Sequence, residues 1–567
     1  MKKVLFFAAF CCAAGLFAAE QPILRAGIVS DTHVTPDMKS CRSLERALRI
    51  FKDHKVDLVI NCGDVASSHK EKAYQNYRAT VKKVYPENKP PELFAFAGHD
   101  RLGFDSYEKA WPFFKKRLEI THEPYSKNVF AGYIFLTAPQ NTNWKIYEKQ
   151  IADACRETPD KPVFLIDHVP ALNTCYNSML WGNGMTRRVL AKYPQIVQLS
   201  GHVHGTFRND QNIWQGEFTA LNAGCTSESW SGDLIGSAPP RLRADEAFIM
   251  ELYKDRILFR RFDLAENKEY KPESPWCVPL PFDRATAPYT AEKRKLIPPP
   301  QFAPGAKLGL APDAVPFSDM ILAIPEIASG DGVFIYRITM KRRNAAGKWE
   351  MFAVQEIYGG YDLPPEKRTV RRHALSAGYF DAGKEYLISV EPVNFFYSAG
   401  RPLETAFTAP EKKQYEVTFE SSEPMKVCKF LAGPDWKKEH PVENGFFVVR
   451  KTWASRLVFP DEEKIWAGPA GTRFRFTIDM QTVVPGPDYR WGFYLRNTKQ
   501  AFYAHHHITT PPGDSGMRRI VVEFEKKKSF HAYHLSVSYG YSGQLKVGHV
   551  RIEKLGPPQR ARGEKFP

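Results

Sequence analysis

The 567-residue sequence predicts a multidomain protein in which an α/β layered domain is followed by two all-β sandwich domains. Two observations lead to this prediction. Up to about residue 264, short apolar runs alternate with amphipathic stretches, which is the pattern of a buried sheet covered by helices. Beyond about residue 310 the helical period disappears and strand-like alternation replaces it. A chain of this length also exceeds what one ordinary core can organise.

The first 19 residues differ from the rest of the chain. Lys2 and Lys3 precede an uncharged apolar stretch over residues 4–19. This pattern is typical of a bacterial-type signal peptide, so residues 1–19 are expected to be removed and the protein to be periplasmic or secreted. An uncleaved membrane anchor is the alternative, although spanning a bilayer takes about 20 apolar residues. No transmembrane segment is expected after the signal peptide.

Residues 22–264 are predicted to form the α/β domain. Five apolar runs read as buried strands, within residues 23–31, 56–64, 92–100, 162–170 and 195–204. Four amphipathic stretches read as helices, at residues 42–55, 71–85, 107–118 and 147–157. A β-rich pair over residues 247–253 and 256–264 closes the domain.

Residues 265–310 are proline-rich and irregular, and predict a linker that wraps around the first domain. Residues 311–410 then alternate as strands. Leu375 and Phe380, ahead of Tyr386, resemble the tyrosine-corner region of a fibronectin type III sandwich.

Residues 414–556 form another strand-rich block, for which we predict a jelly-roll sandwich similar to carbohydrate-binding modules. Its many aromatic side chains are expected mainly in the core, because a sandwich needs large inward-pointing groups. Residues 557–567 form a basic tail.

The formal charge of +16 favours anionic partners such as phosphoesters, nucleic acid or cell-surface polymers. The basic clusters are scattered, however, and no nucleic-acid-binding motif is recognisable. We therefore expect no stable nucleic-acid complex. A polysaccharide or cell-surface polymer is the expected partner of the C-terminal domains.

Every predicted strand of the α/β domain ends in a carboxylate or an imidazole. The residues at these ends are Asp31 and His33 (SDTH), Asp64 (NCGD), His99 (AGHD), His168 (IDHVP), and His202 and His204 (SGHVHG). Ligands of open α/β sheets bind beyond the carboxyl ends of the strands. The members of a D-x-H or H-x-H pair point the same way on an extended chain, so both can reach one ion.

Carboxylates and imidazoles without a thiolate pattern suit zinc, manganese or iron. Two such ions about 3.5 to 4 Å apart, bridged by a carboxylate, are a known device for displacement at phosphorus. The strand ends therefore predict a metal centre.

The order of these motifs, D-x-H, G-D, H-D, H and G-H-x-H, resembles the calcineurin-like metallophosphoesterase family over residues 24–264. The resemblance implies a central β-sandwich flanked by helices and a dinuclear metal centre. It also implies the ligands: Asp31, His33 and His204 for the first metal, His168 and His202 for the second, and Asp64 bridging both. His99 takes the place of the family's histidine that contacts a phosphate oxygen and helps to protonate the leaving group.

The sequence departs from this family at Gly98. The family has an asparagine there, whose carbonyl oxygen ligates the second metal, and glycine offers no side chain. We therefore expect the second site to bind its metal more weakly or to select a different one. Asp100 and Asp167 could fill the gap, or could orient a neighbouring histidine instead.

Together these observations predict an exported metal-dependent phosphohydrolase that cleaves a phosphomonoester or a phosphodiester by metal-activated hydroxide. Its expected cofactors are two divalent ions, Mn, Fe or Zn. The alternative is a catalytically impaired phosphoesterase scaffold that acts as a cell-surface or carbohydrate-binding protein. Gly98 favours the alternative, whereas the six intact ligands and His99 favour the enzyme.

Overall fold

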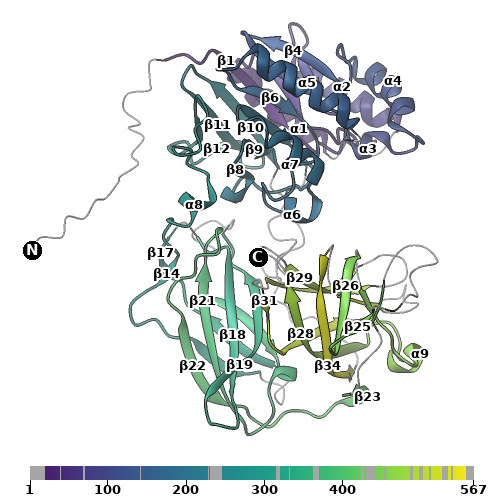
Figure 1. The fold of residues 1–567 in the computed structure, drawn as a ribbon, viewed down its shortest axis with the longest axis vertical. Helices are drawn as coiled ribbons and strands as arrows, with labels where there is room; N and C mark the ends of the chain where they lie inside the picture. Colours follow the sequence, from purple (N-terminus) through teal and green to yellow (C-terminus); the bar gives the residue numbers. More distant parts are fainter. Residues whose placement is uncertain are drawn as a thin grey trace, which may run out of the picture. The chain divides into compact units, whose positions relative to one another are not determined.

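The structure is a computed structural model of the chain (Figure 1). It describes residues 20–38, 40–67, 70–140, 142–227, 229, 245–313, 319–330, 332–361, 370–422, 427–429, 439, 441–452, 455–484, 490–496, 502–509, 513–526, 534–537 and 541–556. The predicted signal peptide and basic tail lie outside the described residues. Two compact units are present, the first ending at Leu296 and the second beginning at Ile297. In the described part of the chain, no helix is long and apolar enough to span a membrane.

Two β-sheets form the centre of the first unit. One sheet has the order β12-β11-β10-β1-β2-β3, with β13 also paired to β11, and the other has the order β4-β5-β6-β7-β9-β8. The strands of the first sheet are β1 (Leu24–Val29), β2 (Leu58–Asn61), β3 (Glu92–Phe94), β10 (Glu246–Leu252), β11 (Arg256–Asp263), β12 (Lys268–Tyr270) and β13 (Trp276–Pro279). Those of the second are β4 (Ser126–Phe130), β5 (Tyr133–Thr137), β6 (Val163–Ile166), β7 (Ile196–Ser200), β8 (Ile213–Gln215) and β9 (Thr219–Asn222).

One apolar core joins the two sheets. Ile28 and Ile60 of the first sheet belong to the same buried cluster as Phe135, Phe164 and Leu199 of the second. Strands β1, β2 and β3 run parallel to one another, as do β5, β6, β7 and β9. The predicted β-sandwich is confirmed, and its parallel strands direct their carboxyl ends to the same edge of each sheet.

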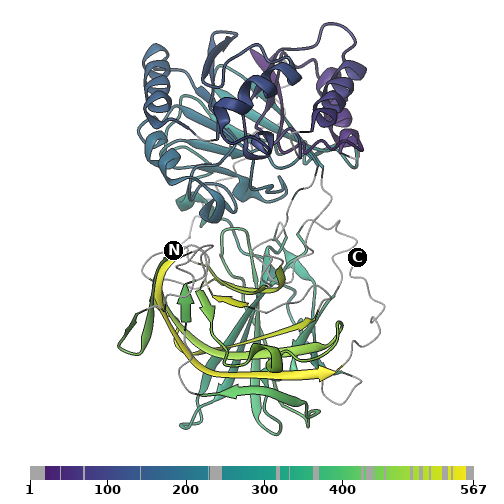
Figure 2. The ribbon, with the colours of Figure 1, turned by 90° about the vertical axis from the view of Figure 1, so that its right-hand side faces the viewer.

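Helices cover the outer faces of both sheets, as Figure 2 shows. The first sheet is covered by α1 (Cys41–Asp53), α2 (Glu71–Val84) and α4 (Tyr107–Leu118), whose apolar sides share a core with Val29, Val59 and Phe94. The second is covered by α5 (Trp144–Glu157) and α7 (Gly184–Leu190). Short helices α3 (Gly98–Arg101), α6 (Ser178–Trp181) and η1 (Asp210–Asn212) lie in the connections. The four predicted helices are confirmed.

The hairpin of β4 and β5 is not among the predicted strands. In β4, apolar and polar residues mix without a clear period, and its burial is only partial. In contrast, every residue of β5 is buried, and β5 pairs in parallel with β6. The hairpin therefore adds two strands to the edge of the second sheet.

The proline-rich segment 265–310 contains regular structure. Strands β12 and β13 both pair with β11, and α8 (Ala291–Arg294) follows them. Trp276 and Val278 alternate along β13 and are buried in the core between the sheets. The first compact unit therefore extends to Leu296.

Two sheets enclose the first core of the second unit, with orders β15-β16-β20 and β19-β18-β21-β22. Their strands are β15 (Gly309–Pro312), β16 (Asp319–Ile324), β18 (Ile335–Arg343), β19 (Trp349–Tyr358), β20 (Arg371–Ser376), β21 (Glu385–Val393) and β22 (Leu403–Thr408); β14 (Gln301–Phe302), β17 (Ile327–Ser329) and η3 (Ala377–Tyr379) flank them. The Tyr386 hydroxyl accepts a hydrogen bond of 2.8 Å from the backbone N–H of Asp381. This contact is that of a tyrosine corner, while the fibronectin type III assignment stays a prediction.

Two further sheets form the second sandwich of this unit, with orders β25-β26-β34-β28-β31 and β24-β27-β33-β29-β30; β23 and β32 pair with β34 and β28. The elements are β23 (Glu416–Ser421), β24 (Val427–Lys429), β25 (Val442–Glu443), β26 (Phe446–Thr452), β27 (Ser455–Leu457), α9 (Glu462–Ile465), β28 (Arg473–Val484), β29 (Arg490–Arg496), β30 (Phe502–Thr509), β31 (Gly513–Asp514), β32 (Arg518–Glu525), β33 (His534–Val537) and β34 (Tyr541–Gly556). Trp466 is buried in its core with Phe474 and Phe524. The two predicted all-β domains are confirmed, while the jelly-roll assignment stays a prediction.

Helix α1 rests on β1 at Gly27. A Cβ atom at this position would lie 2.5 Å from the Phe51 ring, so only glycine lets the helix approach. We expect Gly27→Ala to lower the free energy of unfolding by about 1–3 kcal/mol, because the core must shift to accept the methyl group. Urea unfolding measures this change. Gly27→Ala combined with Phe51→Leu should recover part of the loss, and an unchanged midpoint for Gly27→Ala would contradict the packing.

Candidate metal centre

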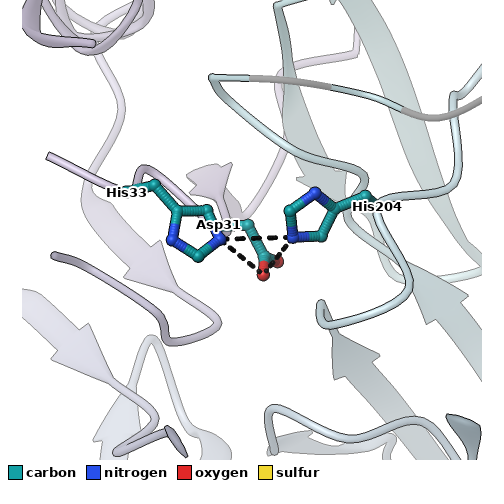
Figure 3. Close-up of side chains that lie close together, drawn as sticks. All are labelled: Asp31, His33 and His204. Carbon is teal, nitrogen blue, oxygen red and sulfur yellow. Dashed lines mark hydrogen bonds and ion pairs between the residues drawn. The ribbon is translucent and has the colours of Figure 1, made fainter. Parts of the chain in front are cut away.

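Asp31 lies two residues after the end of β1, and its carboxylate is fully buried. Its Oδ2 atom accepts hydrogen bonds from Ser30 Oγ at 2.5 Å and from the backbone N–H of His202 at 3.0 Å. Its Oδ1 atom faces His204 Nε2 at 3.0 Å and His33 Nε2 at 3.7 Å (Figure 3). One oxygen therefore fixes the carboxylate, and the other points at two imidazoles.

These three side chains converge on one point. The Nε2 atoms of His33 and His204 lie 3.2 Å apart, and with Asp31 Oδ1 they form the triangle in Figure 3. Among the described residues no hydrogen bond satisfies Asp31 Oδ1, although His204 Nε2 is close. A buried acceptor of this kind facing two imidazole nitrogens fits a divalent cation.

A second group contains Asp64, His168 and His202, whose ligand atoms all lie within 4.8 Å of one another. His168 Nδ1 donates to the Cys62 carbonyl oxygen at 2.8 Å, so Nε2 is the nitrogen that can bind a metal, in exchange for its own proton. His168 Nε2 is buried, lies 3.2 Å from Asp64 Oδ2 and has no hydrogen bond within the described residues. This group also fits a metal ion.

His99 belongs to a third group with His33 and Asp64. It lies on α3, and its backbone N–H donates to Asp64 Oδ1 at 2.9 Å. Its exposed ring meets the His33 ring edge to face, with centroids 4.8 Å apart, and its Nδ1 atom lies 3.4 Å from the Ser67 carbonyl oxygen. The structure thus brings all seven predicted site residues together.

The backbone brings the ligands together by a different route from the predicted one. The D-x-H and H-x-H residues are not extended: five candidate ligands have positive φ angles, namely Asp31 (49°), His33 (40°), Asp64 (51°), His202 (69°) and His204 (47°). At His202 the N–H of Val203 bonds to the Gly201 carbonyl at 2.8 Å, which makes a three-residue γ-turn. Such conformations cost about 1–3 kcal/mol each and persist only where the surroundings impose them.

Electrostatics favour cations at this site. Burial alone would raise the pKa of Asp31, but the charges of His204 and His168 hold that pKa well below its ordinary value. Burial also opposes ionisation of Asp64, yet the charge of His168 brings its pKa to about 2. For His168, the charges of Asp64 and Asp31 outweigh burial and raise the pKa to about 10. Burial and repulsion by His168 lower the pKa of His202 to about 4. Both carboxylates are therefore buried anions at neutral pH.

Asp100 and Asp167 have other partners. The buried Asp100 carboxylate accepts the backbone N–H groups of Val65 at 3.3 Å and Ala66 at 3.2 Å, and so holds the turn that follows Asp64. Asp167 Oδ2 accepts the Tyr147 hydroxyl of α5 at 3.4 Å, and burial raises its pKa to about 7. Neither carboxylate belongs to the three candidate ligand groups.

Gly98 faces a side chain that is not among the residues predicted from the sequence. A Cβ atom at Gly98 would lie 3.0 Å from Gln140 Oε1. Gln140 follows the buried strand β5, just as the predicted site residues follow theirs. The stretch YIFLTAPQ therefore carries the same signal as the other strand ends, with an amide in place of a carboxylate or imidazole.

Part of this sequence matches a known protein family. Residues 24–206 match the family model described as calcineurin-like phosphoesterase. This segment is a calcineurin-like phosphoesterase domain. All six candidate metal ligands and His99 lie within the matched segment of the calcineurin-like phosphoesterase domain, which agrees with a metallophosphoesterase site.

Individual known proteins are similar to parts of this chain. A phosphodiesterase of Methanocaldococcus jannaschii is 34% identical over 65 residues, which are 12% of this chain. The match spans 36% of that curated relative's length. Two solved structures each cover 45% of this chain and are 97% covered themselves. They are a predicted phosphoesterase of Streptococcus pneumoniae (11% identity, TM-score 0.23) and vacuolar protein sorting 29 of Cryptosporidium parvum (13%, TM-score 0.25).

Asp100 provides a test of how the calcineurin-like phosphoesterase domain holds its Asp64 turn. Asp100→Ala leaves two buried N–H groups without an acceptor, each of which costs about 1–3 kcal/mol. We expect the free energy of unfolding to fall by about 2–4 kcal/mol, and to fall less for Asp100→Asn, which keeps one acceptor oxygen.

Urea unfolding of the full chain measures both changes. Asp105→Ala, which removes only a surface ion pair with Lys109, is the matched control and should change stability by less than about 0.5 kcal/mol. Equal stability of Asp100→Ala and wild type would show that the carboxylate does not hold the turn.

Proposed function

We propose that the protein is an exported metal-dependent phosphohydrolase that cleaves a phosphomonoester or a phosphodiester. The observation that carries the proposal is the set of three overlapping groups of carboxylates and imidazoles within the calcineurin-like phosphoesterase domain. Asp64 belongs to two of these groups and His33 to two, so the groups form one continuous site. A single isolated histidine cluster would be weaker support.

Two divalent cations, Mn, Fe or Zn, would be held by this chain's own side chains. Asp31, His33 and His204 would hold the first, His168 and His202 the second, and Asp64 would contact both. When bound, the cations supply Lewis-acid activation of water and neutralise charge on the phosphoryl oxygens. The buried Asp31 Oδ1 and His168 Nε2 atoms support this assignment, because each is a ligand atom that the described residues leave without a hydrogen bond.

His99 is proposed to act on the leaving group. Its ring is exposed while the neighbouring ligands are buried or partly buried, so a substrate can reach it. If Nδ1 donates to the Ser67 carbonyl, a protonated His99 presents Nε2–H to the substrate. That proton can stabilise a phosphoryl oxygen and then pass to the departing alkoxide.

Export and the partners of the second unit are part of the same proposal. The lysines and apolar stretch of residues 1–19 support a periplasmic or secreted location. The two β-sandwiches would place the enzyme on a polysaccharide or other cell-surface polymer. An impaired scaffold that binds such a polymer is the second candidate, and Gly98 is the observation in its favour.

Metal removal distinguishes the enzyme from the scaffold. The purified full chain should contain about two cations and hydrolyse generic phosphodiester or phosphomonoester substrates with added Mn²⁺, and chelation should abolish turnover. Bound cation at 100 times its dissociation constant stabilises a protein by about 2.7 kcal/mol, so chelation should also lower Tm. Fewer than one cation per chain and no turnover would contradict the enzyme.

His99→Ala should lower kcat by about 10²–10⁴-fold, because it removes a general acid, while metal content stays at the wild-type value. Steady-state kinetics and elemental analysis of the same preparation measure both. His54→Ala is the control: His54 lies at the end of α1 and contacts the Phe262 ring, so turnover should be unaffected. Wild-type turnover in His99→Ala would refute this role for His99.

A further inference from the structure

We propose that the side-chain oxygen of Gln140 is the ligand that replaces the missing side chain of Gly98 at the second metal position. The inference rests on the proposed function, because it assumes that Asp64, His168 and His202 hold a cation. It assigns a ligand from a different strand to the position where glycine has none.

The first support is the position of the amide. A Cβ atom built on Gly98 would lie 3.0 Å from Gln140 Oε1, 3.5 Å from Nε2 and 3.6 Å from Cδ. The amide head therefore lies directly beside the place where a side chain at position 98 would begin. An asparagine at 98 and the present conformation of Gln140 would compete for the same space.

The second support is that Gln140 Oε1 has no other function in the described structure. The atom is buried, and none of the described residues gives it a hydrogen bond. Leaving an amide oxygen buried and unpaired is unfavourable, so such an atom is expected to bind a hydrogen-bond donor or a cation. A cation beside it would supply that partner. His168 Nε2 of the second group also lacks a hydrogen bond among the described residues, although Asp64 Oδ2 lies 3.2 Å away.

The third support is the strand order. Strands β5, β6 and β7 are consecutive neighbours in the second sheet and run parallel. Gln140 follows β5, His168 follows β6 and His202 follows β7. The backbone at the end of β5 is tied to both sheets, because Ala138 N–H donates to Ile166 O at 3.1 Å and Gln140 N–H donates to Phe96 O at 2.8 Å. Gln140 therefore occupies the same level of the sheet as the two histidines.

The chemistry of the replacement is conservative. Glutamine and asparagine offer the same neutral carbonyl oxygen, a donor that suits hard divalent cations such as manganese. The net charge of the second site is unchanged by the exchange. The weaker second site expected from Gly98 alone therefore does not follow, because the extra methylene of glutamine lets a neighbouring strand supply the oxygen.

The test measures cation binding, not turnover. The probe is Mn²⁺ added to chelator-treated full-length protein, with binding followed by titration calorimetry and stoichiometry by elemental analysis. In Gln140→Ala we expect the affinity of one of the two Mn²⁺ ions to fall by about 10-fold or more, and the other to stay unchanged. Gln140→Leu, which keeps the side-chain bulk, should lose the same affinity.

A rescue variant provides the sharpest comparison. Gly98→Asn in the Gln140→Ala background restores a carboxamide where the amide head was removed, and should recover most of the lost affinity. Gly98→Asn alone places its Cβ 3.0 Å from Gln140 Oε1 and should not tighten Mn²⁺ binding. Gln195→Ala is the matched control, because Gln195 is also half-buried but its amide bonds to the Cys155 carbonyl oxygen at 3.0 Å.

The outcomes separate this inference from the proposed function. If wild type binds two Mn²⁺ ions and both Gln140→Ala and Gln140→Leu bind them equally well, Gln140 is a packing residue and the inference is wrong. If wild type binds no Mn²⁺, the proposed function itself fails. Loss of one ion in Gln140→Leu together with wild-type unfolding in urea supports the ligand role even where Gln140→Ala is unstable.

Discussion

The metal centre depends on the buried carboxylate of Asp31. This group leaves the first sheet at the end of β1 and is bound by the second, through the backbone N–H of His202. Its own backbone carbonyl accepts the Cys225 thiol and the Ser227 hydroxyl, each at 3.1 Å. A buried anion is costly unless it is paired, and here the pairing draws His33 and His204 toward one oxygen. The same carboxylate thus joins the two sheets and organises the site.

The rest of the geometry follows from two mixed sheets that share one core and whose site-bearing strands, β1 to β3 and β5 to β7, run parallel. Parallel strands direct their carboxyl ends to one edge, and the apolar cluster between the sheets keeps those edges in register. Left-handed backbone at the strand ends then turns the side chains inward. The strain of these turns is offset by contacts such as Asp100 with Val65 and Ala66, which lie outside the ligand groups themselves.

Much of this arrangement could be predicted from the sequence, because buried parallel strands are apolar throughout and their ends stand out as polar. Asp31, His33 and His204 illustrate this, since each lies within five residues of the end of an apolar run. The backbone conformation at those ends could not be predicted, because Asp and His are enriched at positive φ angles but adopt them in only a small fraction of cases. Gln140 was not predicted as a site residue because β5 was not recognised as a strand. This strand is short, and its pairing with β6 depends on contacts between residues far apart in the sequence.

The proposed phosphohydrolase requires two cations at these strand ends. Anomalous X-ray diffraction from crystals of the full-length protein grown with Mn²⁺ tests it most directly. We expect two anomalous peaks, one among Asp31, His33 and His204 and one among Asp64, His168 and His202. No anomalous peak at this site, or peaks bound only by residues elsewhere in the chain, would contradict it.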